Sequence, residues 1–418
     1  MRKKNKKIVA LGLVLVTSMA LLASCGNSDK GSDGSDSSSD SGTESNGILT
    51  VGFWGSSGED KAVEAAIEGV KDEVEGVKEI KLEQYATVND FYEKLPGQIA
   101  AGTAPDIVIA TNEQHLQLIA DGVLAELDGY DFDLSGYTQN AVEAWQYEGK
   151  QYGIPITAAP STFVINTDMW EAAGLGEYPK TWDEVYDAAK ELTKDGVTGL
   201  CIEAGTIFHP TQYMNSFGGG WKDGKEISSD ENVAALEYIF KMFDEGLAIS
   251  AKEAGLTWDG EVFAGDKCAM TTGGTWYVNL MREAAPNTNY TFVPVPGGNG
   301  NQGCTLHSYG VAVVSNTADV DMAAKVAYYM SRKEAQETRA ELIGDRPAIE
   351  EALPVFRELN PQLVVMDDYI GQATSFGYPA DQAFKTDFTA ILENHIYNND
   401  ETSAKDALET LAETYVSN

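Results

Sequence analysis

The chain has 418 residues, with 65 Asp plus Glu against 29 Lys plus Arg, which gives a formal net charge of −36. That length predicts two or three domains, and hydrophobic residues at 43% are enough to build sizeable cores. The acidity argues against a nucleic-acid-binding surface, which needs clustered cations, and against electrostatic docking on anionic lipid.

The amino terminus has the pattern of a secretory signal. An apolar run at residues 8–23 is short for a membrane span, and no later stretch is long and apolar enough to cross a bilayer. A charged start, an apolar middle and small residues at the end predict a signal peptide over residues 1–24. Its start holds five cations and no anion: Arg2, Lys3, Lys4, Lys6 and Lys7.

The signal ends in Leu22-Ala23-Ser24-Cys25, which resembles the lipobox of bacterial lipoproteins. The resemblance implies a diacylglyceryl group on the Cys25 thiol and cleavage just before it. Two acyl chains hold a protein at a membrane where one would be marginal. The alternative is a plain secretory signal with a chance cysteine.

Residues 25–47 are predicted to be a flexible tether that begins at the lipidated cysteine. Residues 26–46 are mostly Ser, Gly and Asp and cannot form a core. Three cysteines remain beyond the tether, and an odd number cannot all pair internally. None has the CxxC spacing, so we expect mostly buried thiols at Cys201, Cys268 and Cys304.

From residue 48 onward, predicted strands and helices alternate. This alternation predicts an α/β fold with a parallel sheet, whose ligands bind at the carboxyl ends of the strands. Residues 54–57 and 111–113 therefore fall at the expected site. The predicted elements are strands at 48–54, 80–85 and 106–110 and helices at 59–74, 91–101 and 113–121.

A second set of elements begins at residue 161. Thr181 and Glu184 form a capping box that opens a helix, and Asp230 is expected to cap another helix, which Gly246 stops. After Asp319 the pattern is mostly helical. The predicted strands of this half are 161–166, 199–203, 291–295 and 311–315.

Several motifs along the body occur in an order that resembles one family. They include Gly102-Thr103-Ala104-Pro105-Asp106 before an apolar strand, and Gly274-Thr275-Trp276 after another. The order and spacing resemble the extracellular sugar-binding proteins of ABC importers, the broad family that includes the maltose-binding proteins. The remaining motifs lie at 152–155, 166–174, 179–184, 263–270, 294–298, 310–315 and 330–336.

The resemblance implies a two-lobed α/β fold of the type II periplasmic-binding-protein kind. Its lobes would be residues 48–157 plus 308–343 and residues 162–304 plus 345–418. Crossing segments near 157–162, 303–309 and 342–349 would join the lobes and act as a hinge that closes on a ligand.

Trp276 is the first candidate for sugar binding. A sugar ring has an apolar C–H face, which suits flat aromatic rings, and an edge of hydroxyls, which suits carboxylates and amides. Trp276 follows Gly273 and Gly274, and it matches a family position that stacks on sugar. The alternative is a core tryptophan at a helix start.

The other candidates stand at strand ends, in loops or at crossings. Trp54 and Ser56 follow the first strand, where Trp54 either binds ligand or packs on a loop. Glu113 either binds hydroxyls beside Asn112 or stabilises a helix start. Arg346 either reaches the cleft or anchors the hinge. The remaining candidates are His307, Tyr378, Trp221 and Trp258, and the last two either touch the ligand or pack on the surface or in the core.

No pattern predicts a catalytic residue, a metal or a cofactor. Residues 298–303 fit GxGxxG, but a strand follows where a phosphate cradle needs a helix. The segment that starts at Asp131 resembles a calcium loop but has its acid one residue late. There is no Gly-x-Ser-x-Gly nucleophile elbow. The four histidines lack zinc spacing: His115, His209, His307 and His395.

The expected function is a lipid-anchored, monomeric binding protein outside the cell membrane. It would capture a sugar or oligosaccharide between its lobes and deliver it to the permease subunits of an ABC importer. A surface glycoside hydrolase is one alternative, since it too needs aromatic subsites and two carboxylates. A binding protein for a non-sugar solute, such as a polyamine or a polyol phosphate, is the other.

Overall fold

The computed structural model describes residues 46–55, 57–301, 303–379, 381 and 383–415. All of them belong to one compact unit, Thr43–Asn418. The predicted signal peptide, Cys25, the tether up to residue 45 and Ser56 lie outside the described residues. Within the described part, no helix is both long enough and apolar enough to cross a membrane.

The first sheet has the strand order β2-β1-β3-β14-β6. β1 pairs in parallel with β2 and β3, whereas β14 runs antiparallel to β3 and to β6, so the sheet is mixed where a parallel one was expected. β3 lies in the middle, and its apolar residues 107–110 are all buried, as expected for a strand covered on both faces. The strands are β1 (Ile48–Trp54), β2 (Glu79–Tyr85), β3 (Ile107–Thr111), β6 (Ile154–Pro155) and β14 (Tyr309–Val313).

The helices around this sheet follow the predicted order with one break. The helix expected over 59–74 divides into two because Gly69 adopts φ 80°, a left-handed conformation that interrupts a helix. The helices are α1 (Ser57–Ile67), α2 (Val70–Glu73), α3 (Val88–Ala101), α4 (His115–Ala120), α5 (Gln139–Glu143), α13 (Val320–Met330) and α14 (Lys333–Ile343). A small hairpin joins β4 (Gln146–Tyr147) to β5 (Lys150–Gln151).

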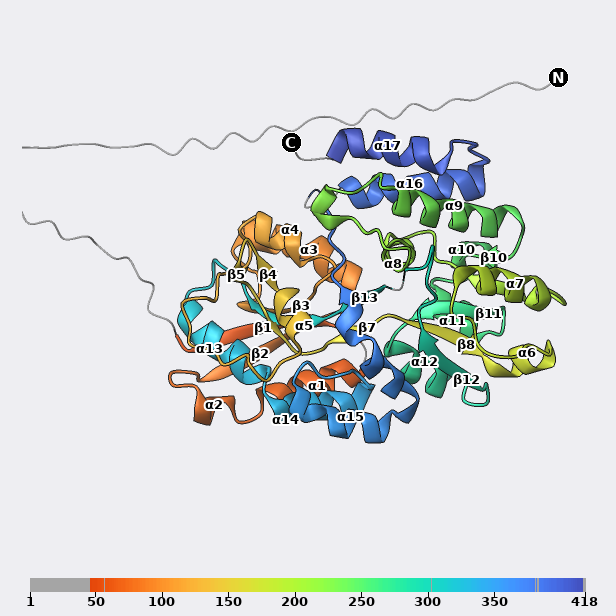
Figure 1. The fold of residues 1–418 in the computed structure, drawn as a ribbon. Helices are drawn as coiled ribbons and strands as arrows, with labels where there is room; N and C mark the ends of the chain where they lie inside the picture. Colours follow the sequence, from red (N-terminus) through yellow and green to blue (C-terminus); the bar gives the residue numbers. More distant parts are fainter. Residues whose placement is uncertain (1–45, 56, 302, 380, 382, 416–418) are drawn as a thin grey trace, which may run out of the picture. The chain divides into compact units, whose positions relative to one another are not determined.

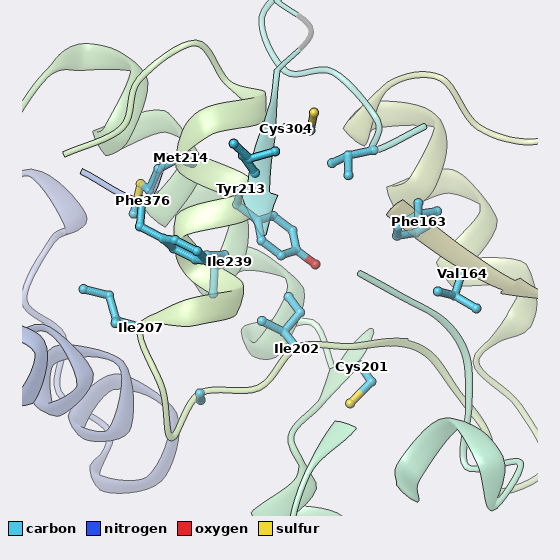
Figure 2. Close-up of a cluster of buried hydrophobic side chains, with 14 of the residues drawn as sticks. Phe163, Val164, Cys201, Ile202, Ile207, Tyr213, Met214, Ile239, Cys304 and Phe376 are labelled. Carbon is cyan, nitrogen blue, oxygen red and sulfur yellow. The ribbon is translucent and has the colours of Figure 1, made fainter. Parts of the chain in front are cut away.

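The second sheet has the order β10-β9-β11-β8-β12 and is also mixed. β9 pairs in parallel with β10 and β11, whereas β8 runs antiparallel to β11 and β12. Figure 2 shows part of the core beside this sheet, where Tyr213 lies among aliphatic side chains. The strands are β8 (Thr162–Asn166), β9 (Thr198–Cys201), β10 (Ala248–Ile249), β11 (Cys268–Gly273) and β12 (Tyr290–Pro294).

The helix starts of this half test two predictions. The capping box between Thr181 and Glu184 is present at the start of α7, as predicted. The cap of α9 is Ser229 and not Asp230, because the Ser229 hydroxyl accepts the backbone N–H of Asn232. The helices are α6 (Thr167–Ala172), α7 (Trp182–Leu192), α8 (Phe208–Ser216), η1 (Lys222–Gly224), α9 (Asp230–Asp244), α10 (Ala251–Ala254), α11 (Asp259–Ala264) and α12 (Trp276–Ala284).

The segments that cross between the two sheets pair with one another. β13 (Cys304–His307) lies between β7 (Ala159–Pro160) and β15 (Ala373–Thr374), and Figure 1 shows β7 and β13 between the sheets. The backbone N–H of Ala158 donates to the carbonyl of Arg346 at 3.0 Å, which joins a third crossing to the first. These contacts tie the expected hinge segments into one unit.

The chain after the third crossing is helical, as predicted, apart from β15. α16 and α17 lie against α9 of the second half (Figure 1). The elements are η2 (Glu350–Ala352), α15 (Leu353–Leu359), η3 (Pro361–Asp368), η4 (Ile370–Gln372), α16 (Ala383–Asn398) and α17 (Ala404–Tyr415). The three cysteines of the body are buried and free, as the sequence predicted.

Candidate functional site

A cleft of about 700 Å³ lies where strand ends of both sheets meet the crossing segments. Trp54 ends β1 and Glu113 follows β3, both at the carboxyl ends of strands in the first sheet. Glu203 follows β9 and Trp276 follows β11 in the second sheet. The first and second crossings supply Thr157, Ala159, His307 and Ser308. Two other hollows, of about 660 and 790 Å³, are lined by elements around the first sheet and by residues next to the third crossing.

Six aromatic rings line this cleft. Trp276 lies 5.8 Å from Phe208 between ring centroids and 5.0 Å from His307. On the opposite side, Trp54 meets Tyr309 edge-on at 6.0 Å. The tryptophans are half-buried, so each keeps part of its ring available to a ligand. The six rings are Trp54, Phe208, Trp258, Trp276, Tyr309 and Phe376.

Two glycines make room for two of these indoles. A Cβ built on Gly274 would lie 2.1 Å from the Trp276 ring, and one on Gly260 would lie 2.2 Å from the Trp258 ring. Real Cβ atoms do not come so close to other atoms. Each indole can therefore lie flat against backbone only because a glycine stands there.

Asp259 and His209 form a buried pair in the second-sheet wall. Their closest atoms, His209 Nε2 and Asp259 Oδ1, are 3.2 Å apart, and the Tyr277 hydroxyl donates to the same carboxylate. Burial lowers the pKa of His209, but the charge and hydrogen bond of Asp259 outweigh it, so the pKa is raised. The Asp259 carboxylate therefore favours the protonated form of His209 more than solvent does.

Asp345 has a cationic partner from the first half of the fold. Arg339 Nε of α14 donates to Asp345 Oδ2 at 2.7 Å, and the Thr275 hydroxyl donates to Oδ1 at 3.3 Å. Burial raises the pKa of Asp345, and the positive charge of Arg339 opposes the shift. One carboxylate on the third crossing thus contacts elements of both halves.

Glu113 has a lysine from the carboxyl-terminal helices beside it. Lys385 Nζ of α16 donates to the backbone carbonyl of Glu113 at 3.2 Å and lies 4.9 Å from the ring centroid of Tyr378. Burial raises the pKa of the Glu113 carboxyl, and the charge of Lys385 partly offsets that rise. Burial also lowers the pKa of Lys385, with Glu113 opposing that shift.

His307 is a neutral imidazole in the cleft wall. Burial, with a smaller effect from His209, lowers its pKa to about 3. Its buried Nε2 has no hydrogen-bond partner among the described residues. A neutral ring with an unpaired nitrogen suits a hydrogen bond to a ligand hydroxyl.

Six of the predicted ligand-binding residues lie in this cleft: Trp54, Asn112, Glu113, Trp258, Trp276 and His307. In the cleft, the Asn112 side chain is hydrogen-bonded to backbone groups of the second crossing. Its Nδ2 donates to the Leu306 carbonyl at 2.9 Å and its Oδ1 accepts the Ser308 N–H at 2.9 Å. Both ends of this amide are thus taken up in holding the second crossing to the end of β3.

Three predicted residues lie outside the cleft lining. Trp221 is fully buried against Phe384 and Phe388 of α16, because the carboxyl-terminal helices cover its loop. Arg346 donates to the Ala158 carbonyl and to Asp367, each at 2.8 Å, so it anchors the hinge, the alternative given above. Tyr378 is buried, and its hydroxyl accepts from Thr211 at 3.3 Å.

Several cleft residues were not predicted from the sequence. Glu203 ends a predicted strand, so the rule that ligands bind at carboxyl ends of strands could have identified it. Asp259 follows Trp258 directly and could have been grouped with it. Phe208, His209, Tyr309 and Asp345 carry no local pattern, because only the tertiary fold brings them to the cleft.

A family model described as bacterial extracellular solute-binding protein matches residues 65–363, most of the chain. The chain belongs to this family. Members of the solute-binding protein family bind and are not enzymes, so the hydrolase alternative is set aside. The two-lobed α/β fold that the sequence predicted is confirmed, with two mixed sheets.

Known proteins resemble this solute-binding protein over most of its length. The diacetylchitobiose-binding protein DasA of Streptomyces coelicolor is 26% identical over 336 residues, which are 77% of this chain and 76% of DasA. The substrate-binding protein Lmo0181 of Listeria monocytogenes, solved with cycloalternan, has a TM-score of 0.76 at 23% identity, covering 88% of this chain and 97% of that one. UgpB of Mycobacterium tuberculosis, solved with glycerophosphocholine, has a TM-score of 0.73 at 19% identity, with 87% and 97% covered.

Proposed function

We propose that this solute-binding protein captures a sugar or oligosaccharide between its lobes and delivers it to an ABC importer. The observation that carries the proposal is the composition of the cleft, where aromatic rings from both halves face a space that buried carboxylates also line. Rings cover the apolar faces of a sugar, and carboxylates accept hydrogen bonds from its hydroxyls. The names of DasA and of the Lmo0181 complex support a carbohydrate as the ligand class.

The positions of the cleft residues explain how binding would favour a closed form. Trp54 and Glu113 belong to the first half and Trp276 and Glu203 to the second, so a ligand that contacts all four joins both halves. Such a ligand binds the closed arrangement better than an open one and shifts the population towards it. The closed form is then the state that the permease subunits would recognise.

The predicted lipid anchor on Cys25 completes the proposal. The thioether-linked lipid would hold the protein at the outer face of the cell membrane, and residues 26–46 would let the body reach the importer. A monomer with one cleft is sufficient for this task.

Isothermal titration calorimetry against a broad panel of mono- and oligosaccharides tests the ligand class. We expect at least one saccharide to bind and to raise the thermal midpoint of unfolding. Heat from a non-sugar solute, with no response to any saccharide in the panel, would refute the carbohydrate assignment.

A polyamine is the second candidate, because four carboxylates line the cleft: Glu113, Glu203, Asp259 and Asp345. Three of them already have a basic side chain beside them, which leaves little room for a polycation to pair with them. A polyol phosphate fits less well, since no Lys or Arg is among the described residues of the lining. The same calorimetric panel, extended with spermidine and glycerol 3-phosphate, separates these solutes from sugars.

A further inference from the structure

The charges in the cleft wall are unequally compensated. Asp259 is paired with His209, Asp345 with Arg339, and Glu113 has Lys385 beside it. Glu203 is the fourth carboxylate of the lining, and the described residues give it no ion pair within 4.0 Å. The charge of Glu203 helps to raise the pKa of His209, but Glu203 is the one carboxylate of the described lining that has neither an ion pair nor a lysine against it.

One oxygen of Glu203 is unused in the protein. Oε1 accepts the backbone N–H of Gly205 at 2.8 Å, which fixes the orientation of the carboxylate. Oε2 is buried and has no hydrogen-bond partner among the described residues, although the side chain lines the cleft and is only 8% exposed. A buried acceptor without a partner is costly, and a donor on a bound ligand would remove that cost.

The surroundings of Glu203 favour positive over negative charge on a ligand. Phe208, Trp258 and Trp276 belong to the same half of the fold and line the same cleft, and their ring faces attract cations. The described lining contains no Lys or Arg that would bind a carboxylate or a phosphate. The net charge of −36 adds a repulsion for anions that acts before contact.

We propose that Glu203 determines the charge selectivity of the cleft, so that saccharides with an ammonium group bind best, neutral ones less tightly and anionic ones weakest. This inference rests on the proposed carbohydrate function and adds a class of sugar to it. Glu203 Oε2 accepts a hydrogen bond from a ligand hydroxyl or ammonium group. A carboxylate on the ligand would meet an unpaired carboxylate instead.

The test uses three neutral tetrasaccharides, cellotetraose, mannotetraose and maltotetraose, each with matched forms in which a C6 hydroxyl is replaced by an ammonium or oxidised to a carboxylate. Calorimetry at pH 7 and low salt measures all nine. On the backbone that binds, we expect the ammonium form to bind at least about tenfold tighter than the carboxylate form, with the neutral form between them. Equal affinity for all three forms would overturn the inference and leave the carbohydrate function standing.

Three variants test whether Glu203 sets the order of affinities among the ammonium, neutral and carboxylate forms. Glu203→Gln keeps an acceptor but removes the charge, so we expect the three affinities to converge. Glu203→Asp keeps the charge and should keep the ranking, and it covers the case in which the Gln variant does not fold. Glu113→Gln is the matched control, because its charge faces Lys385, and it should keep the ranking whatever its effect on affinity.

Two results would count against Glu203. An unchanged ranking in a folded Glu203→Gln variant would show that another group sets the selectivity. A lost ranking in Glu113→Gln would assign the selectivity to Glu113. Binding of none of the nine probes, while spermidine or another non-sugar solute binds, would overturn the carbohydrate function and this inference together.

Discussion

Single side chains in the cleft combine two kinds of surface. The indole of Trp276 offers a flat apolar face, whereas the unpaired Oε2 of Glu203 offers a hydrogen-bond acceptor and the unpaired Nε2 of His307 offers a further polar atom. Both kinds are partly shielded from water, which strengthens polar contacts with a ligand. Changes to these side chains should therefore alter ligand affinity and the pH dependence of stability.

Replacing Trp276 by Ala removes a half-buried ring that lines the cleft at the edge of the core. We expect ligand binding to weaken by about 2 kcal/mol, roughly thirtyfold, because a stacking surface is lost. Calorimetry with the tightest-binding saccharide of the panel measures the change. Trp170→Phe is the control, since Trp170 is buried at α6, outside the cleft lining, and its variant should bind normally. Unchanged affinity in a folded Trp276→Ala protein would remove Trp276 from the site.

His209 should make stability depend on pH in a definite direction. Its pKa is raised in the folded protein, so the stabilisation from the Asp259 pair is fully present below about pH 6.5, the pKa of an unfolded histidine. As pH rises through the higher folded pKa, that stabilisation is lost. The difference in unfolding free energy between the wild type and His209→Gln, from urea titrations at several pH values, should therefore shrink above pH 6.5. A difference that grows with pH would contradict the pairing.

Between the sheets, short crossing segments hold the strand ends in place. Asn112 joins the end of β3 to the second crossing, and Arg346 joins the third crossing to the first. These side chains looked like ligand contacts in the sequence because they stand at strand ends and crossings. Their hydrogen bonds show that residues at strand ends and crossings can instead hold the crossing segments together.

Asn112→Ala should destabilise the fold more than it weakens binding. The change takes hydrogen-bond partners from the buried Leu306 carbonyl and Ser308 N–H, at a cost of about 3 kcal/mol in unfolding free energy. Chemical denaturation measures this loss, and calorimetry on the folded fraction measures affinity. A stable variant with strongly reduced affinity would instead identify Asn112 as a direct ligand contact.

The order of strands and helices could largely be predicted from the sequence, whereas the direction of each strand within its sheet could not. The strand before Trp54 and the capping box at Thr181 rest on local patterns, and both are present. The antiparallel insertion of β14 depends on a return from the second half, which no local pattern records. Trp221 was predicted as a ligand contact with surface or core packing as the alternative. It lies in the core because its covering helix, α16, comes more than 150 residues later.

The family and the two-lobed fold are those that the sequence predicted, while the lipid anchor stays a prediction. Six of the cleft residues could be anticipated, and among them strand-end rules and the family resemblance led to Trp54, Glu113 and Trp276. The rest, such as Asp345 and Tyr309, depends on the crossings that bring distant segments together. The lobe boundaries given by the resemblance also stay a prediction.

Cys25→Ser tests the anchor in cells that secrete the full chain. Loss of the thiol should prevent lipidation, and the protein should move from the membrane fraction to the medium. Fractionation with an immunoblot measures the distribution, and sugar binding by the released protein is the control for folding. Continued membrane association of the serine variant would contradict lipid anchoring.

The position of β14 in the chain limits the order in which the two sheets can fold after export. The first sheet needs β14, which follows every strand of the second sheet in the chain. A polypeptide emerging amino terminus first from a translocation pore therefore cannot complete its first sheet until Val313 has passed through. Until then β3 lacks one neighbour, and chaperones outside the membrane would meet an unfinished sheet edge.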